Sequence, residues 1–333
     1  MMKKLSSPWA LGMLLLAVLL GAASLGLAKP RPRTLTIGMT YIPNVQFAPW
    51  YVAQERGYFR EEGLEVKFDY RMDIDALQLV AAGQLDLAVA GGDQVITARA
   101  QGIPVSYLLT LYAKFPPAIV AKADSGIKSP RDLIGKRIGL PLYGTNLLAI
   151  KAILKKAGVA ESQVQLVDVG YTQIPSLTAG KVDAVVGFAN NEPVKLRAAG
   201  QAVNVIASWD YLNLVGHGLV TGEGQLKRSP ELLRKMVRAT QKGMRYALDE
   251  PDQTFAICLK YLPELGRDQQ RIEKQVLYES LKLWENDYTR QHGLGRSDPK
   301  AWDESQRLML ELGLIKKTTP VRRLLQQQFL EAR

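Results

Sequence analysis

The chain has 333 residues, 47% hydrophobic and 23% charged, which is enough for one large or two medium domains with buried cores. Its formal net charge is +11, but the basic residues are dispersed and form no basic helical face with interleaved aromatics, which argues against nucleic-acid binding. A single cysteine, Cys258, and two histidines, His217 and His292, exclude an internal disulfide and a metal site built from cysteines or from a histidine cluster.

The first 28 residues have the layout of a secretory signal peptide. Lys3 and Lys4 precede an uncharged run from 8 to 28 that is rich in Leu, Ala and Gly and ends in a small-x-small pattern at Ala28. The alternative is a transmembrane anchor, because about 20 uncharged residues are long enough to cross a bilayer. No cysteine ends the run to carry a lipid. With either reading we expect the rest of the chain to be exported, to the periplasm or the cell surface.

Short strands and helices then alternate after a basic linker at 29–33. Runs of β-formers predict strands and glycines mark the ends of helices. The expected elements are a strand at 34–40, a helix at 47–56, a strand at 64–70, a helix at 75–82 and a strand at 85–90.

The same order of elements returns about 97 residues later. We expect a strand at 136–140, a helix at 146–157, a strand at 164–169, a helix at 174–178 and a strand at 182–187. The segments 79–91 and 176–187 share the pattern Ala-Gly-x-apolar-Asp at the end of a helix and the start of a strand. Such a pattern also suits a generic loop between a helix and a strand, but its recurrence in the same order favours a duplicated architecture.

These patterns predict an α/β protein of two lobes, each with a mostly parallel sheet, and a cleft between them. We expect the first lobe to comprise 34–120 and 203–333, and the second to comprise 121–202. The apolar stretch 105–120 joins the lobes, a short helix at 129–136 leads into the second lobe, and 203–221 returns to the first. Helices at 230–250, 252–261, 267–291 and 299–312 are expected to pack against the first lobe.

No catalytic motif stands out. The sequence contains no G-x-S-x-G elbow, Walker A loop, H-E-x-x-H helix or strand-linked G-x-G-x-x-G. We therefore expect a protein that binds a small molecule without transforming it and that uses no cofactor.

Candidate binding residues lie in four turns that follow strands, where open α/β sheets bind ligands. The turns are 40–50, with aromatics and amides; 91–94; 141–145, which opens a helix; and 188–193. Each has a plain structural alternative, since its aromatics suit a core and its polar residues suit turns or helix caps. The candidates, with one residue from the joining stretch, are Tyr41, Asn44, Phe47, Trp50, Asp93, Tyr112, Tyr143, Gly144, Thr145, Asn190 and Glu192.

Residues 41–64, the segment Leu133–Gly139, the Asn-Asn-Glu-Pro turn and the tail at 295–315 resemble solute-binding proteins of the thiamine-pyrimidine type. These are kin of sulfonate-, taurine- and nitrate-binding proteins. The resemblance implies a type II periplasmic-binding clamp that acts as a monomer. Such a clamp binds a solute and delivers it to an ABC permease. It also implies that Asn44 contacts the ligand and that Glu192 pairs with the amino edge of a pyrimidine. The turn Tyr143-Gly144-Thr145 would face the ligand's polar end.

Two positions depart from the pyrimidine binders, which commonly carry His and Gly where this chain has Phe47 and Pro49. The wall is thereby more apolar, and the motif resembles members linked to riboflavin uptake, whose larger ring suits added aromatic surface. We favour riboflavin as the ligand. Hydroxymethylpyrimidine or formylaminopyrimidine is the first alternative. A sulfonate or nitrate is another, favoured by net charge but disfavoured by Glu192. The fungal hydroxymethylpyrimidine phosphate synthase, with its cysteine-rich cluster, is the enzymatic alternative.

Overall fold

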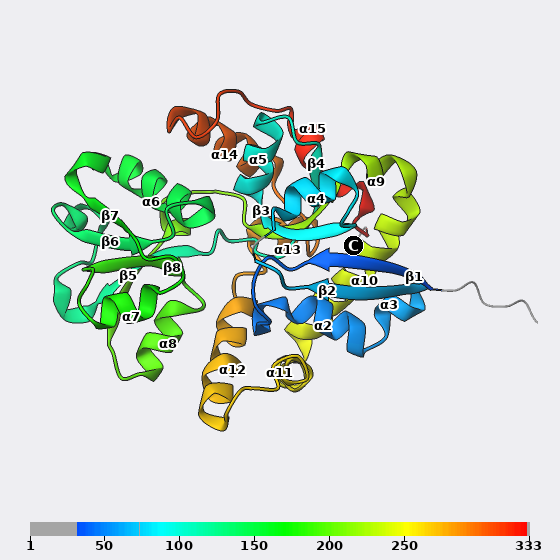
Figure 1. Cartoon of the computed structure of the whole chain (residues 1–333), viewed down its shortest axis with the longest axis horizontal. Coiled ribbons are helices and arrows are strands. Elements are labelled where there is room, and N and C mark those ends of the chain that lie inside the picture. Colours follow the sequence, from blue (N-terminus) through cyan, green and yellow to red (C-terminus); the bar gives the residue numbers. More distant parts are fainter. Residues whose placement is uncertain (1–31, 73, 332–333) are drawn as a thin grey trace, which may run out of the picture.

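The computed structural model describes residues 32–72 and 74–331, so the predicted signal peptide lies outside the described residues. Two sheets of five strands each, both covered by helices, form two lobes side by side (Figure 1). The α/β prediction with two lobes is confirmed. Within the described ranges, no helix combines the length and the apolar character needed to cross a bilayer.

The first sheet has the strand order β2-β1-β3-β10-β4. β1 runs parallel to β2 and β3, and β10 is antiparallel to its neighbours β3 and β4. Its strands are β1 (Arg33–Gly38), β2 (Leu64–Asp69), β3 (Leu87–Gly91), β4 (Val105–Thr110) and β10 (His217–Gly222).

The second sheet repeats this arrangement, with the order β7-β6-β8-β5-β9. β5 takes the place of β10 and is likewise antiparallel to both neighbours. Its strands are β5 (Pro117–Lys122), β6 (Arg137–Leu140), β7 (Gln165–Asp168), β8 (Ala184–Phe188) and β9 (Val203–Ala207).

The aspartate of the repeated Ala-Gly-x-apolar-Asp segment has the same task in both lobes. The carboxylate of Asp86 accepts the backbone N–H of Thr36 at 2.8 Å, and that of Asp183 accepts the N–H of Arg137 at 2.8 Å. Each bond ties the entrance of the central strand of its sheet, β3 or β8, to the parallel neighbour, β1 or β6. The repeat therefore marks a real structural duplication.

The sheets divide the chain a few residues away from the expected lobe boundaries. β5 begins at Pro117 and β9 covers Val203–Ala207, and both pair within the second sheet, although the prediction placed 117–120 and 203–207 in the first lobe. The chain crosses between the sheets at 111–116 and 208–216. An apolar strand near a crossing fits either sheet by its sequence, and only the pairing decides its lobe.

Seven helices of the described chain belong to the two α/β units. They are α2 (Ala48–Glu55), α3 (Tyr58–Glu61), α4 (Ala76–Ala82) and α5 (Gly92–Ala100) in the first lobe, and α6 (Gly144–Ala157), α7 (Gln173–Thr178) and α8 (Glu192–Ala198) in the second. Helix α4 shows why they form: Asp75 caps it by accepting the N–H of Gln78, and Gly83 ends it with φ of 75°. The helix expected at 129–136 is only the short 3-10 helix η3 (Pro130–Leu133), because Gly135 turns the chain with φ of 75°.

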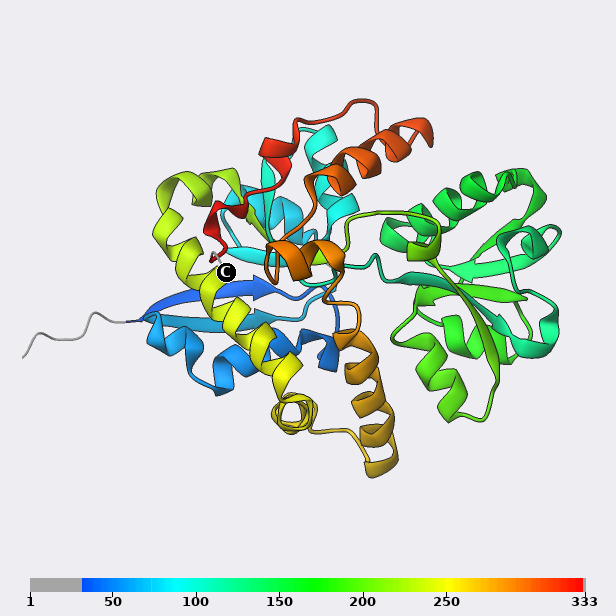
Figure 2. The ribbon, with the colours of Figure 1, turned by 180° about the vertical axis from the view of Figure 1, so that it is seen from behind.

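The C-terminal part is helical, as expected, and α10 crosses the first lobe beside α2 (Figure 2). The helices are α9 (Glu223–Arg228), α10 (Pro230–Asp249), α11 (Pro251–Leu259), α12 (Arg267–Leu281), α13 (Asp287–His292), α14 (Pro299–Glu311) and α15 (Val321–Leu324). The single helix expected at 267–291 is two, because Asn286 caps a new helix by accepting the N–H of Thr289 at 2.9 Å.

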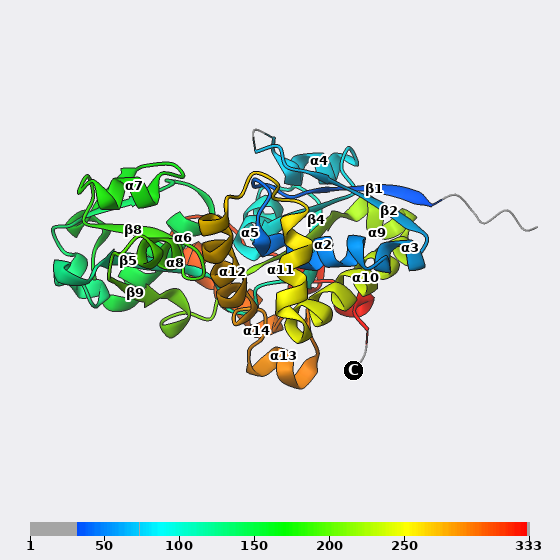
Figure 3. The same ribbon diagram turned by 90° about the horizontal axis from the view of Figure 1, so that it is seen from below.

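Two of the C-terminal helices contact the second lobe as well as the first: α14, whose Glu311 pairs with Lys155 of α6 at 3.1 Å, and α12. Helix α12 packs against η1 (Val45–Phe47) of the first lobe and against α8 of the second (Figure 3). Lys195 of α8 lies 3.0 Å from Glu273 of α12. The expected packing against the first lobe therefore leaves out the contacts that α12 and α14 also make with the second lobe.

Candidate functional site

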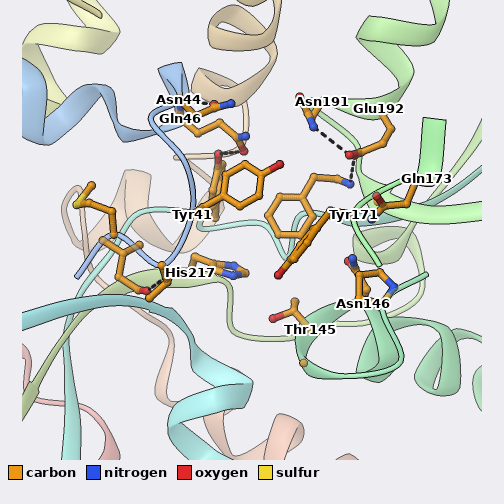
Figure 4. Close-up of a pocket in the computed structure, with 18 of the residues that line it drawn as sticks. Tyr41, Asn44, Gln46, Thr145, Asn146, Tyr171, Gln173, Asn191, Glu192 and His217 are labelled. Atoms are coloured by element: carbon orange, nitrogen blue, oxygen red, sulfur yellow. Dashed lines mark hydrogen bonds between the residues drawn. The ribbon is translucent and has the colours of Figure 1, made fainter. Parts of the chain in front are cut away.

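A cavity of about 350 Å³ lies between the lobes, at the ends of strands from both sheets (Figure 4). In the first lobe it is lined by the segments after β1, β3 and β4 and by the start of β10. In the second it is lined by the segments after β6, β7 and β8. The predicted strand-end turns therefore meet around one cavity.

Aromatic side chains from opposite lobes meet at this cavity. The ring of Tyr41, after β1, lies 5.7 Å from that of Tyr171, after β7, and Tyr171 also contacts Tyr143 with ring centroids 6.4 Å apart. Tyr143 and Tyr171 are 57% and 52% exposed, which places flat apolar surface within reach of solvent. Tyrosine rings in such a position stack on flat ligands, and their hydroxyls supply a polar tip.

Backbone strain before Tyr41 helps to aim its ring. Thr40 has φ of 61°, the one positive value at a residue other than glycine in the described chain. A β-branched residue in this region is a true outlier. The Thr40 hydroxyl donates to the carbonyl of Val89 at 2.9 Å and so ties the strained turn to β3. Strain of this kind is typical of binding sites, where the surrounding structure holds it.

A buried amide network joins the lobes beside the cavity. The side-chain carbonyl of Gln46 accepts the hydroxyl of Tyr112 at 2.8 Å and the amide of Asn190, from the second lobe, at 2.9 Å. Asn190 also donates to the Ser280 hydroxyl of α12 at 2.7 Å. Asn44 caps η1 by accepting the N–H of Gln46 at 2.9 Å, so its oxygen fixes the turn. Asn190 thus acts between lobes rather than on the cavity wall.

A second link between lobes joins the starts of α5 and α6. The Thr145 hydroxyl lies 3.1 Å from both carboxylate oxygens of Asp93. Burial raises the pKa of Asp93 to about 6, and the hydrogen bond from Thr145 opposes that rise. Asp93 lies behind Thr145, which itself lines the cavity.

The carboxylate of Glu192 lies on the wall of the second lobe and is held by its own turn. It accepts the N–H of Phe188 at 2.6 Å and the side-chain amide of Asn191 at 2.9 Å. Burial raises the pKa of Glu192, while these donors act against the rise. Glu192 and Lys195 are the charged side chains of the lining, and Lys195 is paired with Glu273, so the cavity has little net charge.

Three polar atoms of the lining are buried and have no hydrogen-bond partner among the residues that the structure describes. They are Oδ1 of Asn146, Oδ1 of Asn191 and Nδ1 of His217. Burial lowers the pKa of His217 to about 4, which keeps its ring neutral near pH 7. Buried polar groups of this kind are costly unless they are paired, so they are suited to the polar edge of a ligand.

Eight of the predicted binding residues line the cavity: Tyr41, Asn44, Phe47, Tyr112, Tyr143, Gly144, Thr145 and Glu192. The other three do not. Trp50 is fully buried in the core of the first lobe, on the inner face of α2, while Asp93 and Asn190 hold the lobes together behind the wall. The prediction that Trp50 binds the ligand is therefore wrong, because its place on α2 turns the side chain into the core of the first lobe.

Several lining residues were not among those predicted from the sequence. Tyr171 and Gln173 follow the predicted strand at 164–169, and the strand-end rule would have found them. Phe188, Gln46 and Gln94 lie inside the selected turns but were not singled out. His217 gave no signal, because it reaches the cavity only through the antiparallel pairing of β10 with β3 and β4.

Comparison with known proteins gives a consistent pattern. The model of the family described as "NMT1/THI5 like" matches residues 44–254. The riboflavin-binding protein RibY of Chloroflexus aurantiacus is 38% identical over 306 residues, which cover 91% of this chain and 87% of that protein. The formylaminopyrimidine-binding protein of Halalkalibacterium halodurans is 30% identical over 282 residues, covering 81% and 83%. Synthases of 4-amino-5-hydroxymethyl-2-methylpyrimidine phosphate match at 24 to 27% identity.

Among solved structures, the fold is similar to that of the periplasmic aliphatic sulphonate binding protein SsuA from Escherichia coli. The TM-score is 0.70 at 16% identity, with 91% of this chain and 95% of that chain covered. At this identity the likeness concerns the fold alone. The expected periplasmic-binding clamp of two lobes is thereby confirmed.

Proposed function

The chain belongs to the NMT1/THI5-like family, and on this basis we propose that it is the solute-binding component of an ABC importer that captures riboflavin and delivers it to a membrane permease. It would act outside the cytoplasm, as a monomer. The similarity to a riboflavin-binding protein over most of both chains supports this ligand.

The observation that carries the proposal is the character of the cavity wall. Aromatic rings and side-chain amides dominate it, and its one carboxylate and one ammonium leave little net charge. An isoalloxazine ring is flat and uncharged and carries hydrogen-bond donors and acceptors along one edge. Tyr41 and Tyr171 offer aromatic surface on which it can stack, and the unpartnered atoms of Asn146, Asn191 and His217 offer partners for its edge.

The same wall disfavours a sulfonate or nitrate. An anion would need unpaired cations or several N–H donors aimed at it. The lining lysine, Lys195, already lies 3.0 Å from Glu273, and the buried carboxylate of Glu192 would repel an anion. The positive net charge of the chain is therefore not concentrated in the cleft.

The proposed mechanism is closure of the lobes around the solute. Contacts between lobes, from Asp93 to Thr145 and from Asn190 to Gln46, stabilise the closed arrangement. A ligand that touches both lobes binds the closed form more tightly than the open form, and this difference in affinity shifts the protein toward closure. The closed form then docks on the permease.

The direct test is to titrate residues 29–333 with riboflavin and follow flavin fluorescence and thermal unfolding. We expect quenching with saturation and a rise in Tm, both weakened by Tyr171→Ala, which removes an exposed ring. Leu310→Ala, at a similarly exposed position outside the cavity, is the matched control. If riboflavin produced neither signal while formylaminopyrimidine or an alkanesulfonate raised the Tm, the ligand would be reassigned to the compound that raised it.

We further propose that the protein performs no chemistry on its ligand, although synthases belong to the same family. A cysteine cluster like that of the fungal synthase cannot form, since Cys258 is the single cysteine of the chain. It is buried in the core, on α11, and burial raises its pKa. Recovery of unaltered riboflavin after prolonged incubation with the protein is the expected result, and any new product detected by mass spectrometry would contradict it.

A further inference from the structure

A second cavity, of about 700 Å³, lies on the first lobe and shares no lining residue with the cleft. It is bounded by the end of α5, the start of β4, helix α9 and the segment 317–326 that carries α15. In Figure 1 α15 lies at the top of the first lobe, beside β4, and α9 lies on the side of that lobe that faces away from the second lobe.

The charge of this cavity is strongly one-sided. Five cationic side chains line it against one carboxylate, Glu223, and that carboxylate is bound to Arg99. The other four have no carboxylate within ion-pair distance in the described part of the chain. These four are Lys227, Lys317, Arg322 and Arg323. Like charges gathered in one concave site repel one another and attract a counter-ion.

The wall that carries these cations is fixed to the sheet. Arg99, with only 9% of its side chain exposed, pairs with Glu223 at 2.6 Å and donates to the carbonyl of Arg323 at 2.8 Å. The hydroxyl of Ser106, on β4, donates to the same carbonyl at 3.0 Å, and the N–H of Gln326 donates to the carbonyl of Tyr107 at 2.9 Å. The backbone under the arginines is thus held in place before any ligand arrives.

We propose that this cavity binds a phosphate-bearing anion. A guanidinium group can donate two hydrogen bonds to two oxygens of one phosphate, and the ammonium groups of Lys227, on α9, and Lys317 add point charges. Thr318 and Thr319 add hydroxyls to the lining. The contrast with the nearly neutral cleft assigns the anion to this cavity and leaves the cleft to the uncharged solute.

The test measures binding of inorganic phosphate and pyrophosphate to residues 29–333 by calorimetry and thermal shift, with sodium chloride holding the ionic strength constant. We expect both anions to bind and to raise the Tm, and we expect Arg322→Gln/Arg323→Gln to weaken binding at least about tenfold. The control is Lys316→Gln, an exposed neighbour outside the lining, which should bind as the parent protein does. Riboflavin binding should be the same in all three proteins, so failure of either proposal leaves the other intact.

A second experiment distinguishes a lipid headgroup from a soluble phosphate as the source of the anion. Vesicles of phosphatidylcholine with and without phosphatidylglycerol are mixed with the protein and sedimented. Binding to phosphatidylglycerol but not to free phosphate assigns a lipid headgroup, and the reverse assigns a soluble ligand. The proposal would be overturned if phosphate, pyrophosphate and anionic vesicles all failed to bind beyond the effect of sodium chloride, and if the double substitution changed nothing.

Discussion

The two lobes have the same strand order but use one corresponding feature differently. After the central strand of its sheet, β3 or β8, each places a buried acid beside a glycine that has no room for a Cβ. In the first lobe a Cβ on Gly91 would lie 2.2 Å from the carboxylate of Asp93. Asp93 reaches out of its lobe to the Thr145 hydroxyl, 3.1 Å away. The acid of the first lobe therefore serves to hold the second.

In the second lobe the acid turns back on its own strand. A Cβ on Gly187 would lie 2.4 Å from the carboxylate of Glu192, which accepts the N–H of Phe188. Held in this way, Glu192 faces the cavity, and its side chain accepts hydrogen bonds from its own lobe, at Phe188 and Asn191. A duplicated fold thus supplies two equivalent positions, of which one holds the closed arrangement and the other faces the solute.

The strongest test of this contrast is Gly187→Ala. The added methyl occupies the space of the Glu192 carboxylate, so the side chain must leave its N–H donor and the wall. We expect riboflavin affinity to fall by at least roughly 100-fold and unfolding free energy to fall by about 1–3 kcal/mol, as in other overpacked sites. Calorimetric titration and urea unfolding measure the two effects.

Gly266→Ala is the matched control for that substitution, because its φ of −66° suits alanine and the nearest atom to an added Cβ is 3.9 Å away. Binding by Gly187→Ala that equals binding by Gly266→Ala would show that the position of Glu192 is irrelevant to the solute.

Glu192→Gln removes the charge with little change of shape. The remaining carbonyl still accepts the N–H of Phe188, so the turn is expected to fold normally. A ligand N–H that binds a carboxylate loses a charge-assisted bond, and we expect roughly 30-fold weaker binding, or about 2 kcal/mol. Unchanged affinity, with unchanged Tm, would place the solute elsewhere on the wall.

The fold was predictable to the extent that local chemistry determines it. The Asp of each repeated segment, Asp86 and Asp183, ties two strands of its own sheet, so the repeat in the sequence reflects a repeat of hydrogen bonds. Pairing of the crossing strands β5 and β9 was not predictable, because their residues are apolar enough for either sheet. Likewise, the break after α12 depends on the cap at Asn286, a short polar signal inside a long helical pattern.

The site was predictable where it lies at strand ends and not where it depends on contacts between lobes. Tyr41, Thr145 and Glu192 follow strands and line the cavity. Asn190 also follows a strand, yet its amide bonds to Gln46 and Ser280, and no sequence pattern distinguishes these two outcomes. Whether a polar residue at a strand end lines the cavity or bonds to the other lobe depends on how the two lobes meet, which the sequence alone does not give.

Thr145→Val tests the first lobe's side of the contrast. The substitution keeps the shape and removes the hydroxyl that reaches Asp93. Because the bond joins the lobes, we expect closure to be less favourable and riboflavin affinity to fall roughly tenfold, with a smaller change in Tm. Thr97→Val, in the middle of α5 and outside the cavity, is the control. Equal affinity of the two variants would remove this contact from the mechanism of closure.

The last expected effect concerns the pH dependence of stability rather than the affinity for riboflavin. Burial raises the pKa of Asp93 from 3.8 to about 6, so the folded protein holds this proton more tightly than the unfolded chain does. Its contribution to the unfolding free energy is therefore largest below about pH 4 and is lost as pH rises through about 6. Asp93→Asn has no such titration.

The difference in unfolding free energy, parent minus Asp93→Asn, should fall by about 3 kcal/mol across that window, at about 1.4 kcal/mol for each unit by which the pKa is raised. Urea unfolding at several pH values measures this difference, and Asp268→Asn, whose side chain is 97% exposed, gives the baseline. Parallel pH profiles for the parent and Asp93→Asn would mean that the carboxylate is not held in a dry contact between the lobes. Asp93 would then have no part in holding the closed arrangement, and Glu192 would be the one acid of the pair with an assigned task.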